Sequence, residues 1–311
     1  MISVIMSTYN EKVEWIQASI SSILNQTFKN IELIIIVDNP LNQEIRQCLE
    51  QYSGNKRVSV FFNEKNMGLV YSLNRAISVC HGEYIARMDA DDIAIETRLQ
   101  KELDYLNDNN LDFVFANVNQ MSENGKVTYR NAGIDMRPSE INKIIRYGNV
   151  SKHPTWFLKS TVFSDLGGYR NIEYCEDFDF VLRALSMDFK IGLLGTSVLN
   201  YRYRESSISR SNALEQFLKA DYIKRLYIDE KLISTDVTTI NEKYNNLSRK
   251  SKENYAQGLL YFQCFVKNLK QKNILASGIF LIRTVTTSKF LVKKVVDTTR
   301  FKIYERKLSK V

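Results

Sequence analysis

Several common sequence signatures are missing from this 311-residue chain. Its four cysteines, Cys48, Cys80, Cys175 and Cys264, lie far apart and form no C-x-x-C pair. This spacing argues against a zinc site and against a disulfide framework, and it fits a reducing compartment. The first strand-like run begins at Ile2, and no basic segment with a cleavage site precedes it, so we expect no signal peptide.

Glycine-rich phosphate-binding motifs are also absent. No G-x-G-x-x-G follows the first strand, and no G-x-x-x-x-G-K-[ST] occurs in the chain. A dinucleotide, or a triphosphate held by a glycine-rich loop, is therefore not the expected ligand. The chain has no internal repeat and no low-complexity segment, and its charge-free run Ile274–Ile282 is too short to span a bilayer.

The composition that remains is ordinary, but the charge is unevenly distributed. An apolar content of 44% and a charged content of 25% are typical of a globular protein with a full core. Residues 212–311 hold 20 Lys/Arg and 9 Asp/Glu, a net charge of +11, whereas residues 1–211 have a net charge of −3. We therefore expect two parts, a mildly acidic domain over residues 1–211 and a basic region, expected to be helical, over residues 212–311.

The order of the expected elements indicates an α/β fold. Ile31–Val37 is a continuous β-branched run, which is typical of a strand buried on both faces. Four strand–helix alternations with short connections favour a doubly wound, mostly parallel sheet. The expected strands are Ile2–Ser7, Ile31–Val37, Arg57–Phe62, Tyr84–Met88, Phe113–Asn117 and Val198–Leu199; the expected helices are Glu11–Gln26, Glu44–Tyr52, Leu69–Cys80, Ile95–Asn107, Ser139–Tyr147, Cys175–Arg183, Ala213–Tyr227, Glu253–Leu269 and Ile274–Val296.

Polar clusters follow three of the expected strands. They are Thr8–Glu11, Asp38–Asn39 and Asp89–Asp92. In open α/β sheets, ligands bind beyond the carboxyl ends of the strands, where these clusters meet. The last cluster places three carboxylates within four positions, and such charges repel unless a cation or a sugar's hydroxyls share them. Taken alone, a short aspartate cluster is more often a solvated loop, but closely spaced carboxylates also suit Mg²⁺ or Mn²⁺.

Other residues offer the remaining chemistry of a nucleotide-diphosphate site. Tyr9 can stack on a base, and Asp38 can accept a hydrogen bond from a base N–H. Glu176 and Asp177 begin an expected helix, and Asp177 could abstract a proton from an incoming hydroxyl. Each residue also has a structural interpretation, because Tyr9 and Asp38 suit turns and acidic side chains suit a helix N-terminus.

Seven short motifs occur in order over roughly residues 1–210. They are Val4–Asn10, Ser19–Phe28, Glu32–Asp38, Asn66–Leu69, Gly82–Asp92, Gly167–Tyr169 and Glu176–Asp179. Together they resemble the motifs of the family 2 inverting glycosyltransferases with the GT-A fold, of the kind that builds bacterial capsule, exopolysaccharide or O-antigen. The resemblance implies a nucleotide-binding half over residues 1–117 and an acceptor half over residues 118–211.

The resemblance also implies a role for each matching residue. It places Thr8, Tyr9, Glu11, Asp38 and Asn66 at the nucleoside, Asp89 and Asp91 at the ribose or diphosphate, Asp91 and Asp92 at a divalent metal (Mn²⁺ or Mg²⁺), and Asp177 as general base with Glu176 beside it. The implied reaction is an SN2-like transfer from a nucleotide-diphosphate sugar, with a UDP-sugar expected, to a saccharide or lipid-linked saccharide. The enzyme would lower the activation barrier of this transfer by positioning donor and acceptor and by stabilising the charge that develops on the leaving diphosphate.

The sequence departs from the family pattern at two places. After the second strand, many members carry two acids and then Gly-Ser-Thr, whereas this chain has Val37, Asp38 and then Asn39–Leu41. Many members have a histidine near residue 204, where this chain has Arg204. An arginine cannot bind a metal but can hold a phosphate with two parallel hydrogen bonds, so we expect Arg204 at the donor diphosphate.

Two other functions are compatible with parts of this pattern. A catalytically silent relative would bind a nucleotide sugar as a scaffold of a polysaccharide assembly complex; the intact Asp91, Asp92 and Asp177 argue against it. A sugar-nucleotide pyrophosphorylase would need a glycine-rich, arginine-bearing first loop, and Ser7–Asn10 is not one.

The basic region over residues 212–311 predicts contact with a membrane surface. Its last 25 residues interleave basic and apolar side chains, namely Lys289, Lys293, Lys294, Arg300, Lys302, Arg306, Lys307 and Lys310 with Phe290, Leu291, Val295, Val296, Phe301 and Tyr304. The pattern suits an anionic membrane surface, although a solvated face is the alternative. We expect a cytoplasmic protein that is peripheral on the inner face of the plasma membrane, and no nucleic-acid partner, because no binding motif occurs.

Overall fold

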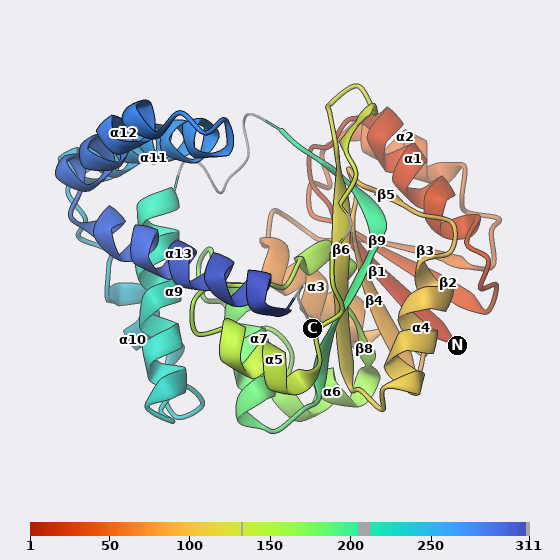
Figure 1. The fold of residues 1–311 in the computed structure, drawn as a ribbon. Helices are drawn as coiled ribbons and strands as arrows, with labels where there is room; N and C mark the ends of the chain where they lie inside the picture. Colours follow the sequence, from red (N-terminus) through yellow and green to blue (C-terminus); the bar gives the residue numbers. More distant parts are fainter. Residues whose placement is uncertain (132, 205–211, 309–311) are drawn as a thin grey trace. The chain divides into compact units, whose positions relative to one another are not determined.

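The computed structural model describes residues 1–131, 133–204 and 212–308 (Figure 1). The chain forms two compact units. The first contains Met1–Lys143, Val150–Asn171 and Glu176–Arg204, and the second contains Ile144–Asn149, Ile172–Cys175 and Glu205–Val311. Two short segments before residue 211 therefore pack with the C-terminal helices, so the expected boundary at that position stays a prediction.

The first unit is built on a mixed β-sheet. Its described strands are β1 (Ile2–Thr8), β2 (Ile31–Val37), β3 (Val58–Phe62), β4 (Tyr84–Asp89), β5 (Ile93–Ala94), β6 (Phe113–Met121), β7 (Val127–Tyr129), β8 (Phe157–Lys159) and β9 (Ile191–Arg202). The order is β3-β2-β1-β4-β8-β6-β9-β5, with β7 paired to β6. Strands β3, β2, β1 and β4 are parallel, and β8 is antiparallel to both β4 and β6.

Helices connect these strands. They are α1 (Val13–Leu24), α2 (Gln43–Glu50), α3 (Leu69–Ser78), α4 (Arg98–Asp108), α5 (Pro138–Ile144), α6 (Ser160–Leu166) and α7 (Glu176–Ser186), together with the 3₁₀ turn η1 (His153–Thr155). The crossovers α1, α2 and α3 join successive parallel strands, as the alternating pattern predicts. This arrangement brings the ends of β1, β2 and β4 to one edge of the sheet.

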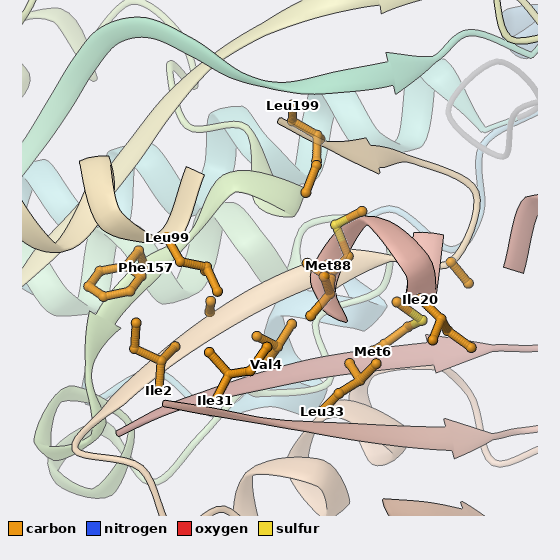
Figure 2. Close-up of a cluster of buried hydrophobic side chains, with 14 of the residues drawn as sticks. Ile2, Val4, Met6, Ile20, Ile31, Leu33, Met88, Leu99, Phe157 and Leu199 are labelled. Atoms are coloured by element: carbon orange, nitrogen blue, oxygen red, sulfur yellow. The ribbon is translucent and has the colours of Figure 1, made fainter. Parts of the chain in front are cut away.

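The core of the first unit lies between the sheet and its helices. Ile2, Val4 and Met6 alternate along β1 and are fully buried in one apolar cluster, which Ile20 of α1 and Leu33 of β2 join (Figure 2). Full burial of an aliphatic side chain contributes about 1.5–3 kcal/mol, so the cluster holds the strand ends firmly in register.

Strand β9 is much longer than the expected Val198–Leu199. It starts at Ile191 and pairs in parallel with β6 along most of its length. Glycines interrupt the apolar pattern of this strand, so the pattern did not predict its first half. A Cβ on Gly195 would lie 2.6 Å from the carbonyl carbon of Ile134. The close approach of the backbone near Ile134 therefore requires glycine at position 195, although glycine in a sequence is more typical of a loop than of a strand.

The second unit is helical over its described residues. Its helices are α9 (Ala213–Ile228), α10 (Val237–Glu242), α11 (Arg249–Lys270), α12 (Ile274–Thr287) and α13 (Phe290–Leu308). Leu214, Tyr255 and Leu291 form its buried cluster. No helix in the described part of the chain is both long enough and apolar enough to cross a bilayer.

The expectation of one helix over 274–296 is wrong. Ser288 adopts an extended conformation (φ −149°, ψ 123°) and separates α12 from α13. The hydroxyls of Thr286 and Thr287 in the last turn of α12 donate to the carbonyl oxygens of Ile282 and Arg283, four residues earlier. Such bonds, and β-branched side chains in succession, weaken a helix, which gives a physical reason for the break here.

Candidate active site

The turn after β1 is organised by one carboxylate. Glu11 Oε2 accepts hydrogen bonds from Thr8 Oγ1 (2.7 Å) and from the Tyr9 backbone N–H (2.7 Å). Thr8 is buried, whereas Tyr9 leaves 42% of its surface exposed. Glu11 therefore fixes the turn and leaves the Tyr9 ring free to receive a planar ligand.

Asp38 holds the loop that follows β3. Its Oδ1 accepts from Asn63 Nδ2 (2.6 Å) and the Met67 N–H (2.8 Å), and its Oδ2 accepts from the Gly68 N–H (2.8 Å). Asn66 accepts from the same Gly68 N–H at 3.1 Å. The carboxylate of Asp38 is thus committed to the backbone of the Asn66–Gly68 motif, and its remaining lone pairs are what a base could use.

The aspartates after β4 form a compact cluster. One carboxylate oxygen from each of Asp89, Asp91 and Asp92 lies within 4.8 Å of the others. Burial, followed by repulsion from Asp89, raises the pKa of Asp91 to about 6. Burial and the two neighbouring carboxylates raise the pKa of Asp92 well above its ordinary value. The cluster is therefore short of positive charge.

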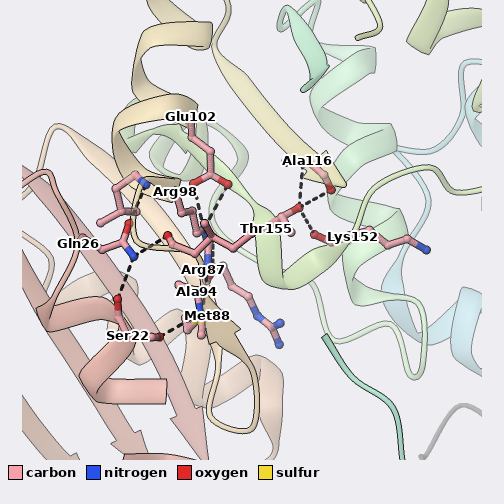
Figure 3. A network of polar contacts seen from close by, with 12 residues as sticks. Ser22, Gln26, Arg87, Met88, Ala94, Arg98, Glu102, Ala116, Lys152 and Thr155 are labelled. Carbon is pink, nitrogen blue, oxygen red and sulfur yellow. Dashed lines mark hydrogen bonds and ion pairs between the residues drawn. The ribbon is translucent and has the colours of Figure 1, made fainter. Parts of the chain in front are cut away.

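Helix α1 fixes the backbone of this cluster. Ser19 Oγ donates to the Asp89 carbonyl oxygen (2.9 Å), and Ser22 Oγ accepts from the Ala94 N–H (3.0 Å). Gln26 donates to the Ile95 carbonyl oxygen (2.9 Å) and accepts from the backbone N–H at the start of α4 (Figure 3). The Ser19–Phe28 motif therefore clamps both ends of the β4–β5 turn.

A buried ion pair supports the preceding strand. Arg98 and Glu102 are fully buried and lie 3.1 Å apart (Figure 3). Arg98 Nη2 also donates to the carbonyl oxygen of Arg87 (2.8 Å). Because breaking such a pair leaves a buried charge, the contact holds β4 rigidly behind the aspartates.

Arg87 is a charged residue inside β4 that the motif reasoning missed. It is 4% exposed, and its Nη2 lies 2.5 Å from Asp89 Oδ1. Its Nε and Nη1 have no hydrogen-bond partner among the described residues. Burial and the nearby Arg87 lower the pKa of His153 well below its ordinary range, so His153 is neutral and bonds Tyr169 Oη (2.8 Å). An arginine in the middle of the apolar run Tyr84–Met88 was the available signal.

The end of β9 closes the cluster from the other side. The Arg202 N–H donates to Asp92 Oδ1 (2.7 Å), and its Nε donates to the Asp91 carbonyl oxygen (2.7 Å). Arg204 Nη2 lies 2.9 Å from Asp91 Oδ2. Residues 202 and 204 are two apart at and just beyond the strand end, so both side chains reach the same face. Arg202 was not predicted as a site residue, although this spacing could have revealed it.

Three cationic side chains lie against the ring of Trp15 in α1. Lys12 Nζ and the guanidinium carbons of Arg202 and Arg204 lie 4.7, 4.8 and 5.9 Å from the centre of its ring. Trp15 is 8% exposed, so the ring is fixed by packing. Each such contact contributes about 0.5–2 kcal/mol, and together they set the position of Arg204 against Asp91.

Glu176 and Asp177 begin α7 in the same unit. Burial, followed by repulsion from Asp177, raises the pKa of Glu176 to about 7, and Asp89 acts in the same direction. Glu176 is therefore within electrostatic reach of Asp89 in the aspartate cluster. Arg183 ties α7 to the glycine turn before it, because its Nη1 and Nη2 donate to the carbonyl oxygens of Leu166 and Gly168 (both 2.8 Å).

The aspartate cluster has the features of a divalent-cation site. Its donors are all oxygens, as Mg²⁺ and Mn²⁺ prefer. Asp92 Oδ2 is buried and has no hydrogen-bond partner in the described part of the chain. A cation would satisfy this oxygen and relieve the repulsion that raises the two pKa values.

The structure thus brings most of the predicted residues to one edge of the sheet. Thr8 and Asp89 are the last residues of β1 and β4. The turns after β1, β2 and β3 carry Tyr9, Glu11, Asp38 and Asn66; Asp91 and Asp92 follow β4; Arg204 follows β9; and Glu176 and Asp177 start α7. The contacts of this set with a donor or an acceptor stay predictions.

The fold and the site define a glycosyltransferase of the GT-A type. The structure matches that of S. aureus TarS 1-349, solved in complex with UDP-GlcNAc, with a TM-score of 0.61 over 92% of each chain at 18% identity. The likeness covers the mixed sheet and confirms the predicted fold class.

The sequence model described as glycosyl transferase family 2 matches residues 3–165. An uncharacterised glycosyltransferase of Methanocaldococcus jannaschii is 34% identical over 68% of this chain and 74% of its own length. The O-antigen biosynthesis glycosyltransferase WbnJ of Escherichia coli is 34% identical over 75% of this chain and 91% of its own. The amylovoran biosynthesis glycosyltransferase AmsE of Erwinia amylovora is 25% identical over 68% and 79%. The chain belongs to glycosyl transferase family 2.

Proposed function

We propose that this enzyme transfers a sugar, with inversion, from a nucleotide-diphosphate sugar to a saccharide or lipid-linked saccharide in bacterial surface polysaccharide synthesis. The observation that carries the proposal is the Asp89–Asp92 cluster after β4, which Glu176 at the start of α7 reaches electrostatically. The relatives named for O-antigen and amylovoran synthesis support the polysaccharide class. The UDP-GlcNAc complex of TarS supports a UDP-sugar donor.

The donor would bind across the turns. Tyr9 stacks on the base, Asp38 accepts from a base N–H, and Thr8, Glu11 and Asn66 shape the pocket around them. Asp89 and Asp91 meet the ribose or the diphosphate, and Arg204 holds a phosphate with its planar fork. Asp91 and Asp92 would hold a divalent cation, which when bound neutralises charge on the leaving diphosphate.

Asp177 acts as the general base. The acceptor hydroxyl oxygen forms a bond to the anomeric carbon on the face opposite the diphosphate, and its proton passes to the Asp177 carboxylate. The bond from the anomeric carbon to the diphosphate oxygen breaks, and its electron pair leaves with the nucleoside diphosphate. Glu176, whose pKa is raised to about 7, stays protonated over much of the neutral range and so spares Asp177 a second adjacent charge.

A donor panel tests this proposal. Thermal shift with UDP-, GDP- and dTDP-sugars, each with Mn²⁺, Mg²⁺ or chelator, should identify one donor that stabilises the protein. Asp177→Asn should lower turnover of that donor about 10³-fold while the shift persists, since base catalysis contributes about 10²–10⁴-fold. Asp165→Asn, at an exposed position on α6, is the matched control. Unchanged turnover in Asp177→Asn would remove the base assignment, and binding without turnover by any donor would favour the scaffold.

A further inference from the structure

Helix α12 exposes its most apolar side chains. Ile274, Leu275, Ile279 and Ile282 are 69%, 81%, 48% and 63% exposed. At 100° per residue these four positions fall on one half of the helix circumference. A helix that faces water places such residues inward, so the exposed half of α12 is apolar where a surface helix is normally polar.

Two small polar side chains are buried on the other half of the same helix. Ser277 is 4% exposed and Thr284 is fully buried. Their hydroxyls donate to the carbonyl oxygens of Asn273 and Phe280 in the same helix (both 2.7 Å), so they need no partner outside it. Helix α12 lies along α11 (Figure 1). The helix therefore buries two small polar groups beside Phe280, which packs on Tyr261 of α11, and leaves its large aliphatic side chains exposed.

The charge around this face has one sign. Residues 254–296 contain seven Lys/Arg and no Asp or Glu. Lys270 and Lys272 flank the α11–α12 connection beside Leu269, which is 49% exposed, and Arg283 lies at the edge of the apolar half. An apolar face with a basic rim complements the acyl boundary and the anionic headgroups of a bilayer, whereas a water-facing or self-pairing surface gains nothing from uniform positive charge.

We propose that the exposed face of α12 lies in the boundary between headgroups and acyl chains of an anionic membrane. Leu275, Ile279 and Ile282 enter the apolar layer, and Lys272 and Arg283 contact phosphate groups. This inference does not rest on the proposed glycosyl transfer, because it uses only the shape and charge of the second unit.

The proposal moves the membrane surface that the sequence predicted on the last helix. In α13, Leu291 is fully buried and Phe290 packs against the same buried cluster. Lys293 Nζ pairs with Asp221 at 2.7 Å. Part of the predicted membrane surface therefore packs or forms ion pairs within the second unit. Lys310, which was also predicted there, lies outside the described residues.

Vesicle flotation with the full chain tests the proposal. Wild-type protein should float with phosphatidylcholine vesicles that contain about 30% phosphatidylglycerol, and binding should fall in about 0.5 M salt. The triple variant Leu275→Asn, Ile279→Asn, Ile282→Asn should bind about tenfold or more weakly. Ile233→Asn, at a position 54% exposed in the same unit, should bind as wild type. All four substituted positions are exposed, so unfolding midpoints should stay unchanged.

Three outcomes would overturn the proposal. Wild-type protein could fail to float with anionic vesicles, or the triple variant could float as well as wild type. Sedimentation could instead show a dimer that the triple variant breaks, with no vesicle binding, which would assign the face to a second copy of the chain. Nucleotide release from the donor sugar, measured on the same samples without vesicles, reports the catalytic unit separately, so a failure of membrane binding and a failure of glycosyl transfer can be told apart.

Discussion

Arg87 illustrates how one residue can be placed for function rather than stability. Its ion pair with Asp89 uses one nitrogen, while two buried nitrogens, Nε and Nη1, have no partner among the described residues. Each unpaired buried donor costs about 1–3 kcal/mol, so the protein tolerates a cost that an apolar side chain would avoid. Arg98 is the contrasting case, because its guanidinium is fully buried and bonds Glu102, Met88 and the Arg87 carbonyl oxygen.

Substitution of these two arginines should therefore have opposite effects. Arg87→Met should change the unfolding free energy by only about 1 kcal/mol, since the lost ion pair is offset by relief of the unpaired donors, yet lower donor turnover about 100-fold because Asp89 loses its cation. Arg98→Met should cost about 3–5 kcal/mol because it strands Glu102. Urea unfolding and steady-state kinetics measure both. Equal losses of stability in the two variants would contradict a functional placement of Arg87.

Glu176 predicts a pH dependence of stability. Its pKa is raised from 4.5 to about 7 in the folded protein, so between these values the folded state holds a proton that the unfolded state has lost. Stability from this group is therefore greatest below pH 4.5 and falls as the pH rises toward 7. Relative to wild type, Glu176→Gln should gain about 2.5 kcal/mol between pH 5 and pH 8. Urea unfolding of both proteins without metal at the two pH values measures the difference, and a constant difference would contradict the raised pKa.

At the scale of elements, α1 and β9 act as a pair around the aspartates. α1 supplies the clamp on the β4–β5 turn and the Trp15 ring, and β9 supplies Arg202 and delivers Arg204 just beyond its end. The Trp15 ring contacts the guanidinium groups of both Arg202 and Arg204. The position of Arg204 therefore depends on Trp15, which is not itself a predicted ligand-binding residue.

Trp15→Leu should raise the KM for the donor about five- to tenfold and change kcat less than about twofold, since it removes cation–π contacts worth about 1 kcal/mol from a ground-state binding group. Trp15→Phe should recover part of this affinity. Gln17→Ala, on the exposed side of the same helix, should leave both constants unchanged. A fall in kcat with an unaltered KM would show that the ring does not act through diphosphate binding.

The parts of the fold that the sequence predicted are those with local signals. Short apolar runs predicted β1, β2 and β4, and polar residues lie at the carboxyl ends of these strands as expected. Residues missed by this reasoning act through tertiary contacts: Trp15 is an ordinary core aromatic until β9 is placed beside it. The antiparallel insertion of β8 between β4 and β6 has no local signature, because partner choice depends on the whole sheet.

Hydrophobic patterns predicted the wrong element bounds at two places, β9 and the helix that begins at Ile274. Gly195 broke the apolar pattern of β9 because neighbouring backbone leaves no room for a side chain. The apolar run after Ile274 predicted one helix, yet threonine hydroxyls that bond their own backbone precede a break at Ser288. In both cases hydrophobic periodicity was a weaker determinant than backbone geometry.

At the scale of the whole molecule, each unit has its own buried cluster. The predicted donor and metal residues all lie in the first unit. Since ligands stabilise only the folded form that binds them, donor and metal should each stabilise that unit by about 2.7 kcal/mol at a hundredfold excess over Kd and so raise its melting temperature. We therefore expect calorimetry of the full chain to resolve two transitions, of which one responds to UDP with Mn²⁺ and returns to its original temperature with chelator.

Two core substitutions assign these transitions. Val4→Ala removes methyl groups from the fully buried cluster of the first unit and should lower the ligand-responsive transition, whereas Leu291→Ala should lower the other by about 2–5 kcal/mol. Asp92→Asn should abolish the metal-dependent part of the shift, because it removes an oxygen of the cluster, and leave the second transition in place. A single transition that moves as one with ligand and with both core variants would show that the two units unfold together, and the C-terminal helices would then be part of the donor site's stability.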